Sequence, residues 1–242
     1  MGWSYSFWKP SFYPEGLASS DFLSYYANHF DTVEVDSTFY RIPRSQTVTE
    51  WKHQTTENFL FSFKFPQKIT HVKMLKDSEE ETRIFLERVD LLGAKLGVLL
   101  LQFPPMFRDQ HFPLLKDYLR MLPSEHHYAV EVRNKSLLKE ELYSLLKEHN
   151  VALAWIDAAK MPLTAKMTAD FIYVRWEGDR KTVTGTLGKT ETDRTQQIET
   201  WAEKIEHLSE NGTPVFGYFS KYYSGFPTKD ATELLKHVTK SH

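Results

Sequence analysis

The chain of 242 residues contains no cysteine. This absence excludes disulfide bonds, metal sites built from thiolates and a cysteine nucleophile, because each of them needs a cysteine sulfur. A chain without cysteine is typical of a reducing compartment, and we expect a cytoplasmic protein. No basic stretch followed by an apolar segment opens the chain, so we expect no signal peptide.

Long hydrophobic runs and an excess of one charge are also missing. No apolar run approaches the roughly 20 residues that a membrane-spanning helix needs, so we expect no membrane partner. Lysine and arginine number 30 against 32 aspartate and glutamate, and the formal net charge is −2. This balance argues against strong non-specific binding to DNA, while a local basic site for nucleic acid stays open.

The sequence also lacks the motifs of several common enzyme classes. There is no glycine-rich phosphate loop, no G-x-S-x-G, no H-E-x-x-H, and no nicotinamide or flavin motif. Histidine pairs with the spacing of a barrel zinc site are absent as well. A single Mg²⁺ held by two carboxylates stays open, because such sites need few protein ligands. The sequence assigns neither a cofactor nor an oligomeric state.

What the chain does have is a regular alternation of apolar strand-like segments with helical ones. The strand-like segments are residues 32–35, 60–65, 98–102, 127–131, 151–156, 171–176 and 214–219. Alternation of this kind favours a parallel sheet with helical crossovers. The length is close to the roughly 250 residues of one barrel, so residues 1–242 are predicted to form a single TIM-type α/β barrel domain.

Seven strands are one fewer than a closed barrel of this type contains. The deficit falls at the N-terminus, where Met1, Gly2 and Trp3 leave little room for a strand. We therefore expect a first strand that is truncated or missing. Its absence would leave two strand edges unpaired, which is a structural liability.

Nearly every strand-like segment ends in charged or amide residues. They are Glu34, Asp36, Lys64, Gln102, Glu131, Arg133, Asp157, Arg175, Glu177 and Lys221. In parallel α/β barrels the active site lies at the carboxyl ends of the strands. The pattern therefore predicts a site at this rim, without indicating its reaction.

Four residues are candidates for catalysis: Glu34, Asp36, Glu131 and His71. Glu34 and Asp36 stand two apart on one strand and so point to the same side, where paired carboxylates can act as acid and base. Alternatively, one of them caps the following loop. Glu131 shares a side with Arg133, which suits either an orienting role or a structural ion pair. His71 is a candidate acid or base or an ordinary loop histidine.

Four cations would meet at the same rim: Lys64, Arg133, Arg175 and Lys221. Barrel enzymes frequently bind phosphate near the last two strands, where Arg175 and Lys221 fall. Because Arg offers a planar fork and Lys a point charge for anions, we expect a small anionic ligand. The alternative is that these cations only balance the rim carboxylates.

Polar and aromatic residues at the strand ends complete the predicted substrate-binding set. Its further members are Gln102, Asn134, Asp157, Glu177, Tyr40 and Tyr222. Gln102 would orient the anion, and the tyrosines would stack on a sugar or a base. The aromatic residues could equally pack loops over the rim.

Several motifs occur in a fixed order along the chain. They are Gly2-Trp-Ser-Tyr5, Phe12-Tyr-Pro14, Val33-Glu-Val-Asp-Ser-Thr-Phe-Tyr40, Phe63-Lys64, Ile69-Thr-His71, Gln102-Phe-Pro104, Val130-Glu-Val-Arg-Asn134 and Tyr173-Val-Arg175. Together they resemble the YecE-like family, which is classed as a domain of unknown function. The resemblance extends over essentially the whole chain. It implies a TIM barrel and carries no settled activity.

The chain departs from this resemblance in three respects. Family members usually begin with a short apolar strand, whereas this sequence starts inside the Gly-Trp motif. An Asn pair common after the last strand is replaced by Ser220-Lys221, and a later Asn by Asp230. Glu177 stands where many members have His. The resemblance thus implies a recognisable rim with altered chemistry.

These observations favour an enzyme that acts by acid–base chemistry on a phosphorylated or carboxylated substrate similar to a sugar or nucleotide. Hydrolase, lyase and isomerase reactions all fit the predicted residues. Two other functions stay open. One is a protein that binds or processes nucleic acid through its aromatic and basic rim, and the other is a small-ligand sensor without catalysis.

Overall fold

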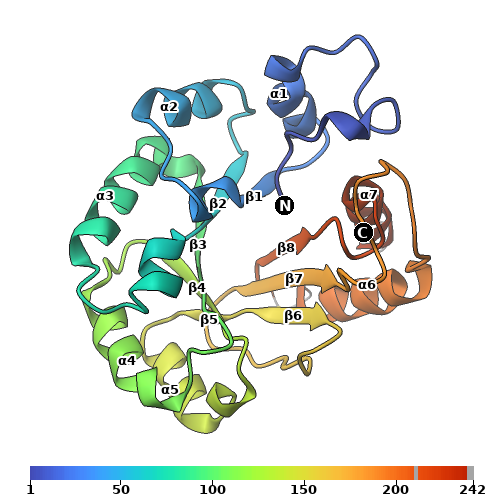
Figure 1. The fold of residues 1–242 in the computed structure, drawn as a ribbon. Coiled ribbons are helices and arrows are strands. Elements are labelled where there is room, and N and C mark those ends of the chain that lie inside the picture. Colours follow the sequence, from blue (N-terminus) through green and yellow to red (C-terminus); the bar gives the residue numbers. More distant parts are fainter. Residues whose placement is uncertain (210–211, 239–242) are drawn as a thin grey trace.

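The computed structural model describes residues 1–209 and 212–238, in which strands and helices alternate along the chain (Figure 1). The strands are β1 (Thr32–Val35), β2 (Leu60–Lys64), β3 (Leu96–Gln102), β4 (His127–Glu131), β5 (Ala152–Leu153), β6 (Trp155–Ala158), β7 (Ile172–Gly178) and β8 (Val215–Phe219). The helices are α1 (Phe22–Ala27), α2 (Ser45–His53), α3 (Glu79–Val89), α4 (Phe112–Met121), α5 (Glu140–Glu148), α6 (Thr195–Ser209) and α7 (Pro227–Val238). Short 3₁₀ or π-helical segments comprise Ser6–Trp8, Ser19–Asp21, Ser37–Phe39, Lys68–Val72, Asp90–Lys95, Asp109–His111 and Lys135–Leu137.

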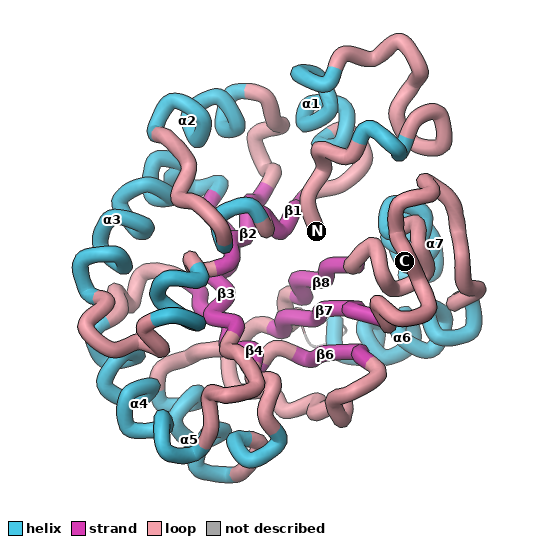
Figure 2. The backbone as a smooth tube through the Cα atoms, viewed as in Figure 1, coloured by secondary structure: helices cyan, strands magenta, loops and turns pink. Residues whose placement is uncertain are grey.

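All strand pairs are parallel and fall into two sheets, with orders β1-β2-β3-β4-β5 and β6-β7-β8. Only Ala154 separates β5 from β6, and its N–H donates to the carbonyl of Val130 in β4 (2.9 Å). The first half of this segment therefore pairs with β4 and the second half with β7, which joins the two sheets. The helices lie outside the strands (Figure 2).

The structure confirms an α/β fold with parallel strands, and each of the seven predicted segments contains a strand. Segment 151–156 contains both β5 and the start of β6. The two outermost strands are β1 and β8, and among residues 1–209 and 212–238 no strand lies between them. Pairing between β1 and β8 is therefore absent from the described sheets, as the strand count leads us to expect, and Met1 and Gly2 bond to Phe219 of β8 and Glu34 of β1 at one end of the opening.

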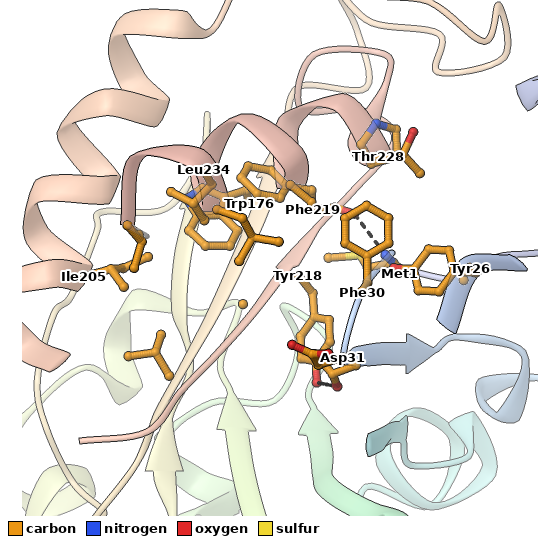
Figure 3. Close-up of a pocket in the computed structure, with 18 of the residues that line it drawn as sticks. Met1, Tyr26, Phe30, Asp31, Trp176, Ile205, Tyr218, Phe219, Thr228 and Leu234 are labelled. Carbon is orange, nitrogen blue, oxygen red and sulfur yellow. Dashed lines mark hydrogen bonds between the residues drawn. The ribbon is translucent and has the colours of Figure 1, made fainter. Parts of the chain in front are cut away.

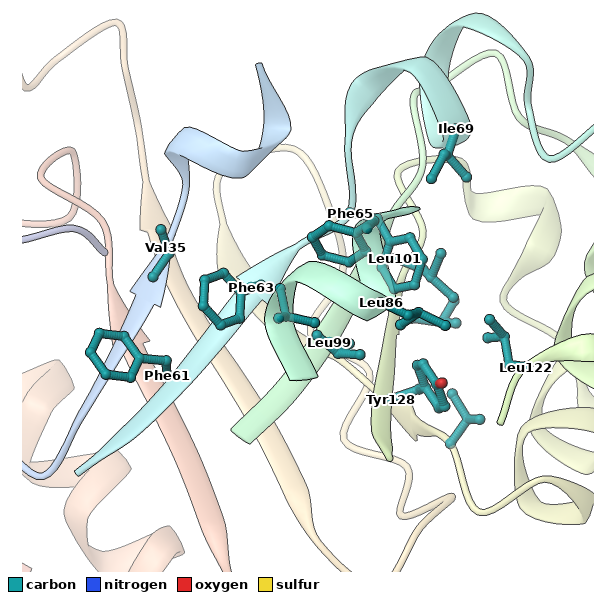
Figure 4. Close-up of a cluster of buried hydrophobic side chains, with 14 of the residues drawn as sticks. Val35, Phe61, Phe63, Phe65, Ile69, Leu86, Leu99, Leu101, Leu122 and Tyr128 are labelled. Carbon is teal, nitrogen blue, oxygen red and sulfur yellow. The ribbon is translucent and has the colours of Figure 1, made fainter. Parts of the chain in front are cut away.

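Alternating residues of the strands face two different apolar layers. Phe61, Phe63, Leu99 and Leu101 point outward and pack beneath the helices, together with Leu86 of α3 (Figure 4). The inner faces hold a second cluster in which small side chains are frequent, including those of Ala129, Ala152 and Ala154. Since successive side chains of a strand point to opposite faces, both layers follow from the apolar runs in the sequence.

Local sequence also explains where helices begin. Glu79, Glu80 and Glu81 occupy the first turn of α3, where carboxylates interact favourably with the helix dipole. Pro113 lies in the first turn of α4, a position that tolerates the missing N–H. None of the helices in the described parts of the chain is both long and apolar enough to span a membrane.

Candidate functional site at the carboxyl ends of the strands

The carboxyl ends of the parallel strands lie at one end of the sheets, which we call the mouth. At the mouth, the buried Arg175 of β7 links several carboxylates. Its Nε and Nη2 donate to Glu34 (2.9 and 2.8 Å), and Nη1 donates to Glu131 and lies 2.6 Å from Glu177. The Tyr173 hydroxyl also donates to Glu34 (2.6 Å). Arg175 is 1% exposed and both Glu34 and Glu131 are 0% exposed. The guanidinium is therefore already occupied by protein groups.

The opposite charges in this cluster keep both Arg175 and Glu131 ionised. Burial disfavours the charged form of Arg175, but Glu34 and Glu131 outweigh that effect and hold its pKa well above the usual range. Burial also opposes ionisation of Glu131, yet Arg175 and Arg133 lower the pKa of this carboxyl to about 2. Gln102 and Arg133 each donate to Glu131 at 2.8 Å. Glu131 is thus a fixed anion at neutral pH, which suits orienting its neighbours and not donating a proton.

Asp36 is the carboxylate that this cluster leaves least satisfied. Its Oδ1 is buried and has no hydrogen-bond partner, although the side chain as a whole is 34% exposed. Lys64 Nζ and Arg175 Nη2 lie 3.7 and 3.8 Å from that oxygen. Asp36 therefore combines a buried, unpartnered oxygen in cationic surroundings with a side chain that is partly exposed.

Two adjoining pockets open at the mouth, with volumes of about 260 and 500 Å³. The smaller, here the Asp36 pocket, is lined by Met1, Tyr5, Asp36, Tyr40, Lys64, Arg175, Glu177, Arg180, Ser220, Lys221 and Tyr222. The larger, here the Arg133 pocket, is lined by Pro105, Glu131, Arg133, Ile156, Ala158, Ala159, Lys160, Met161, Glu177, Gly178, Asp179, Arg180 and Lys181. Glu177 and Arg180 line both pockets, so the two compartments meet at these side chains.

Cations and aromatic rings occur together in the Asp36 pocket. Lys221 Nζ lies 5.2 Å from the ring centre of Tyr222 and 5.8 Å from that of Tyr5, while the Arg180 guanidinium lies 4.7 Å from Tyr222. Among the described residues, Lys221 forms no ion pair with a carboxylate. Burial, followed by the charge of Asp36, raises the pKa of Tyr5 to about 12. Lys221 is therefore the cation of this pocket best placed to bind an added anion.

Gly178 fixes the position of the loop that carries Arg180. Its φ of +65° is in the left-handed region, and a Cβ there would lie 2.1 Å from the carbonyl oxygen of Tyr222. The same carbonyl accepts a hydrogen bond from the N–H of Asp179 (3.2 Å). Glycine thus allows the loop after β7 to approach the segment after β8.

The structure brings most of the predicted site residues together at the mouth. Glu34 and Gln102 lie in the buried cluster and line neither pocket, and Glu131 joins the same cluster at the wall of the Arg133 pocket. Tyr40 is 75% exposed at the edge of the Asp36 pocket. His71 lies beside Phe39 (ring centres 4.8 Å apart), and burial, with the charges of Lys64 and Arg133, lowers its pKa. His71 does not line either pocket.

Two predicted residues are directed elsewhere. Asn134 accepts a hydrogen bond from the N–H of Ser136 (3.0 Å) and donates to the carbonyl of Pro105 (2.7 Å), so it fixes a turn. Asp157 accepts from Trp201 Nε1 of α6 (2.9 Å), on the outer face of β6. Neither residue lines the two mouth pockets.

The structure also adds residues that sequence reasoning missed. Tyr173, Lys160, Arg180 and Lys181 all contact the cluster or line a pocket. Tyr173 stands two residues before Arg175, so the period of two along the strand could have indicated it. The other three lie on loops after β6 and β7, where no periodic pattern reports a side chain's direction.

Across residues 1–209 and 212–238, no group of three or more His, Asp or Glu side chains is arranged to hold a metal ion. The two carboxylates that face the Asp36 pocket, Asp36 and Glu177, are both in contact with Arg175. A metal cation at the mouth would bind through the carboxylates of Asp36 and Glu177.

Comparisons with known proteins agree on one family. A profile described as "Protein of unknown function DUF72" matches residues 1–242. The UPF0759 protein YecE of Escherichia coli K12 is 28% identical over 217 residues, covering 79% of this chain and 76% of that protein. The UPF0759 protein YunF of Bacillus subtilis is 25% identical over 254 aligned residues, covering 93% and 89%.

Two crystal structures share the fold. A DUF72 family protein of Thermotoga maritima matches with a TM-score of 0.82 and 27% identity, over 99% of this chain and 96% of that one. A DUF72 family protein of Enterococcus faecalis matches with a TM-score of 0.78 and 24% identity, over 91% and 94%. The expected YecE-like family is therefore confirmed.

Proposed function

Because the chain belongs to the DUF72 family, whose description assigns no activity, we propose a function from the chemistry of its own mouth. The chain acts as an enzyme that binds a small anionic substrate, similar to a sugar phosphate, sugar acid or nucleotide, and transforms it by proton transfer. The mouth corresponds to the active-site end of a TIM-type barrel. The observation that carries the proposal is Asp36, a carboxylate that lines a pocket rich in cations and whose Oδ1 has no hydrogen-bond partner.

The buried cluster separates residues that organise the site from those that meet the substrate. Glu34 and Glu131 are fully buried and held by Arg175, so they keep that arginine charged and in place. In the Asp36 pocket the lining carboxylates are instead Asp36 and Glu177. We therefore assign proton transfer to Asp36, with Glu177 as the second carboxylate.

Lysines and arginines around the Asp36 pocket would bind the anionic group. Lys64, Lys221 and Arg180 line it together with Arg175, against the two carboxylates Asp36 and Glu177. Cations in a partly enclosed site attract an anion more strongly than they do in open water. Tyr222, in contact with both Lys221 and Arg180, offers a ring on which a sugar or base can pack.

A ligand screen by thermal shift, with and without Mg²⁺, tests binding. The probes are sugar phosphates, sugar acids, nucleotides and short oligonucleotides. A ligand at 100 times its dissociation constant stabilises the protein by about 2.7 kcal/mol, which corresponds to roughly 5–10 °C for a domain of this size. We expect Lys221→Ala to weaken binding at least tenfold. Lys147→Ala, an exposed lysine on α5, is the matched control and should leave affinity unchanged.

The reaction is then sought with the ligand that binds. Asp36→Asn should retain binding and lose turnover by at least a hundredfold, because it removes the proton-transfer group without changing the size of the side chain. A ligand recovered unchanged after long incubation with the wild-type chain would indicate a sensor and contradict the enzyme. Binding only of oligonucleotides, with a steep dependence on salt, would instead assign the mouth to nucleic acid.

A further inference from the structure

The cavities of the described chain differ in the charges that line them. A third cavity, of about 390 Å³, is mostly apolar and is lined by residues of α1, β1, β8 and α7 (Figure 3). Trp8, Trp176 and Thr228 line it together with one carboxylate, Asp31, and no lysine or arginine. The two mouth pockets, in contrast, contain lysine and arginine side chains on both sides of their junction. An anionic ligand is therefore attracted to the mouth, and the arrangement of cations there indicates how many negative groups it carries.

Glu177 lies where the Asp36 pocket and the Arg133 pocket meet. Its Oε1 lies 2.6 Å from Arg175 Nη1 and 3.8 Å from Arg133 Nη2, and its Oε2 lies 3.8 Å from Arg180 Nη2. The guanidinium groups at this junction are thus already paired with a carboxylate. Contacts of 3.8 Å are longer than hydrogen bonds, so Glu177 keeps lone pairs that can accept from a ligand hydroxyl. The junction suits an uncharged, hydroxylated part of a ligand.

Beyond the junction, two lysines of the Arg133 pocket lack a carboxylate partner. Among the described residues, Lys160 and Lys181 form no ion pair, although both line this pocket. Asp179 accepts a hydrogen bond from the backbone N–H of Lys181 (2.9 Å), and Val183 is 1% exposed. These contacts fix the loop after β7, so its lysine stays at the pocket.

The Asp36 pocket has cations of its own on the other side of the junction. Lys221 forms no ion pair within the described parts of the chain, and Lys64 lies 3.7 Å from Asp36. Only Glu177 and Arg180 line both pockets, so these lysines and those of the Arg133 pocket fall on opposite sides. Two lysines on each side suit a phosphate, because this group carries up to two negative charges near neutral pH.

We propose that the substrate is a small molecule with two phosphate groups, one at each end of an uncharged, hydroxylated middle. One phosphate binds at Lys221 in the Asp36 pocket, and the other binds at Lys160 and Lys181 in the Arg133 pocket. The middle lies between them, at the junction. This inference rests on the proposed function, in which the mouth binds an anionic substrate. The pockets, of about 260 and 500 Å³, together lie within the roughly 300–1,000 Å³ of small-molecule sites.

Three phosphorylated probes test the number of phosphate groups. They are a six-carbon sugar alcohol with a phosphate at each end, the same alcohol with one phosphate, and inorganic pyrophosphate. Isothermal titration calorimetry at constant ionic strength measures their dissociation constants. We expect the bisphosphate to bind at least a hundredfold more tightly than the monophosphate, because its second phosphate is held close to the second pocket by the first. Pyrophosphate, whose two phosphates are adjacent, should bind no more tightly than the monophosphate.

A double variant locates the second phosphate. When Lys160→Ala and Lys181→Ala are combined, the bisphosphate should bind within about threefold of the monophosphate, because only one pocket still holds a phosphate. Lys147→Ala combined with Lys236→Ala is the matched control. It removes two lysines of α5 and α7 that line neither pocket, and it should keep the hundredfold difference.

Hexanediol with a phosphate at each end has the same carbon chain without free hydroxyls and tests the middle. It should bind at least tenfold more weakly than the sugar alcohol bisphosphate, because Glu177 then receives no hydrogen bond. Equal binding of these two bisphosphates would overturn the hydroxylated middle.

The outcomes separate this inference from the proposed function on which it rests. Equal affinities for the bisphosphate and the monophosphate would overturn the second phosphate and leave the anion site of the proposed function intact. A hundredfold difference that persists without Lys160 and Lys181 would do the same. Binding of none of the probes would contradict the proposed function itself, and this inference with it.

Discussion

Buried charges are paired at the mouth, and buried polar groups are unpaired in the apolar cavity lined by Trp8, Trp176 and Thr228. At the mouth, Arg175 is surrounded by Glu34, Glu131 and Glu177, so each buried charge meets the opposite charge. In the cavity, the indole N–H groups of Trp8 and Trp176 are buried and have no hydrogen-bond acceptor. The mouth thus balances its buried charges, whereas the second region leaves buried donors without acceptors. Substitutions in the two regions should therefore change the free energy of unfolding in different ways.

The largest effect is expected from removing the central cation of the mouth. Arg175→Met removes the guanidinium that Glu34, Glu131 and Glu177 share, and breaking a buried ion pair in this way costs about 3–5 kcal/mol. Urea denaturation measures the loss. Arg180→Met is the matched control at the same mouth, where the arginine side chain is 65% exposed, and should change the unfolding free energy by less than about 0.5 kcal/mol. Equal losses in the two variants would contradict a special role for the buried cluster.

A pH-dependent effect is expected in the first turn of α7. Burial raises the pKa of Asp230 to about 7, although Ser224 donates a hydrogen bond to it (2.6 Å). The folded state therefore holds this proton more tightly than the unfolded chain, and its stabilising contribution is present below about pH 4 and is lost as the pH rises to 7. Asp230→Asn should stabilise the protein by about 2–4 kcal/mol at pH 8 and by little at pH 4.

Thermal unfolding across this pH range provides the measurement. Asp117→Asn, an exposed aspartate of α4, is the control and should not change the pH profile. A constant difference between Asp230→Asn and wild type at every pH would show that Asp230 does not titrate over this range.

A smaller loss is expected where the two loops of the mouth meet. Gly178→Ala places a Cβ against the Tyr222 carbonyl in a left-handed backbone conformation and should cost about 1–3 kcal/mol. Gly16→Ala, where nothing lies within 4 Å of the added carbon, is the control and should be neutral or slightly stabilising. Differential scanning calorimetry compares the two. Unchanged stability in Gly178→Ala would show that the loop can move away without cost.

The smallest effect is a gain. Thr228→Val removes a buried hydroxyl that has no hydrogen-bond partner and should stabilise the protein by about 0.5–1 kcal/mol. Thr232→Val removes a hydroxyl that does have an acceptor and should not increase stability. If both variants lose stability in urea titrations, the Thr228 hydroxyl has a hydrogen-bond partner in solution.

The sequence by itself determined the strands and which of their ends are polar. Runs such as Val98–Leu101 are apolar on both faces, and buried parallel strands require this. The period of two along β7 placed Arg175 and Glu177 on one side, and the same period placed Glu34 with Asp36 on β1. These are local properties, so a single sequence carries them.

Only the tertiary structure decided which of these residues meet. Glu34 and Arg175 are 141 positions apart, and their contact depends on how the sheets curve. Asp157 shows the limit most clearly, because a shift of one residue in a strand exchanges its two faces, and the structure turns Asp157 outward to Trp201. The unpartnered donors of Trp8, Trp176 and Thr228 likewise come from three separate segments that only folding brings to one cavity.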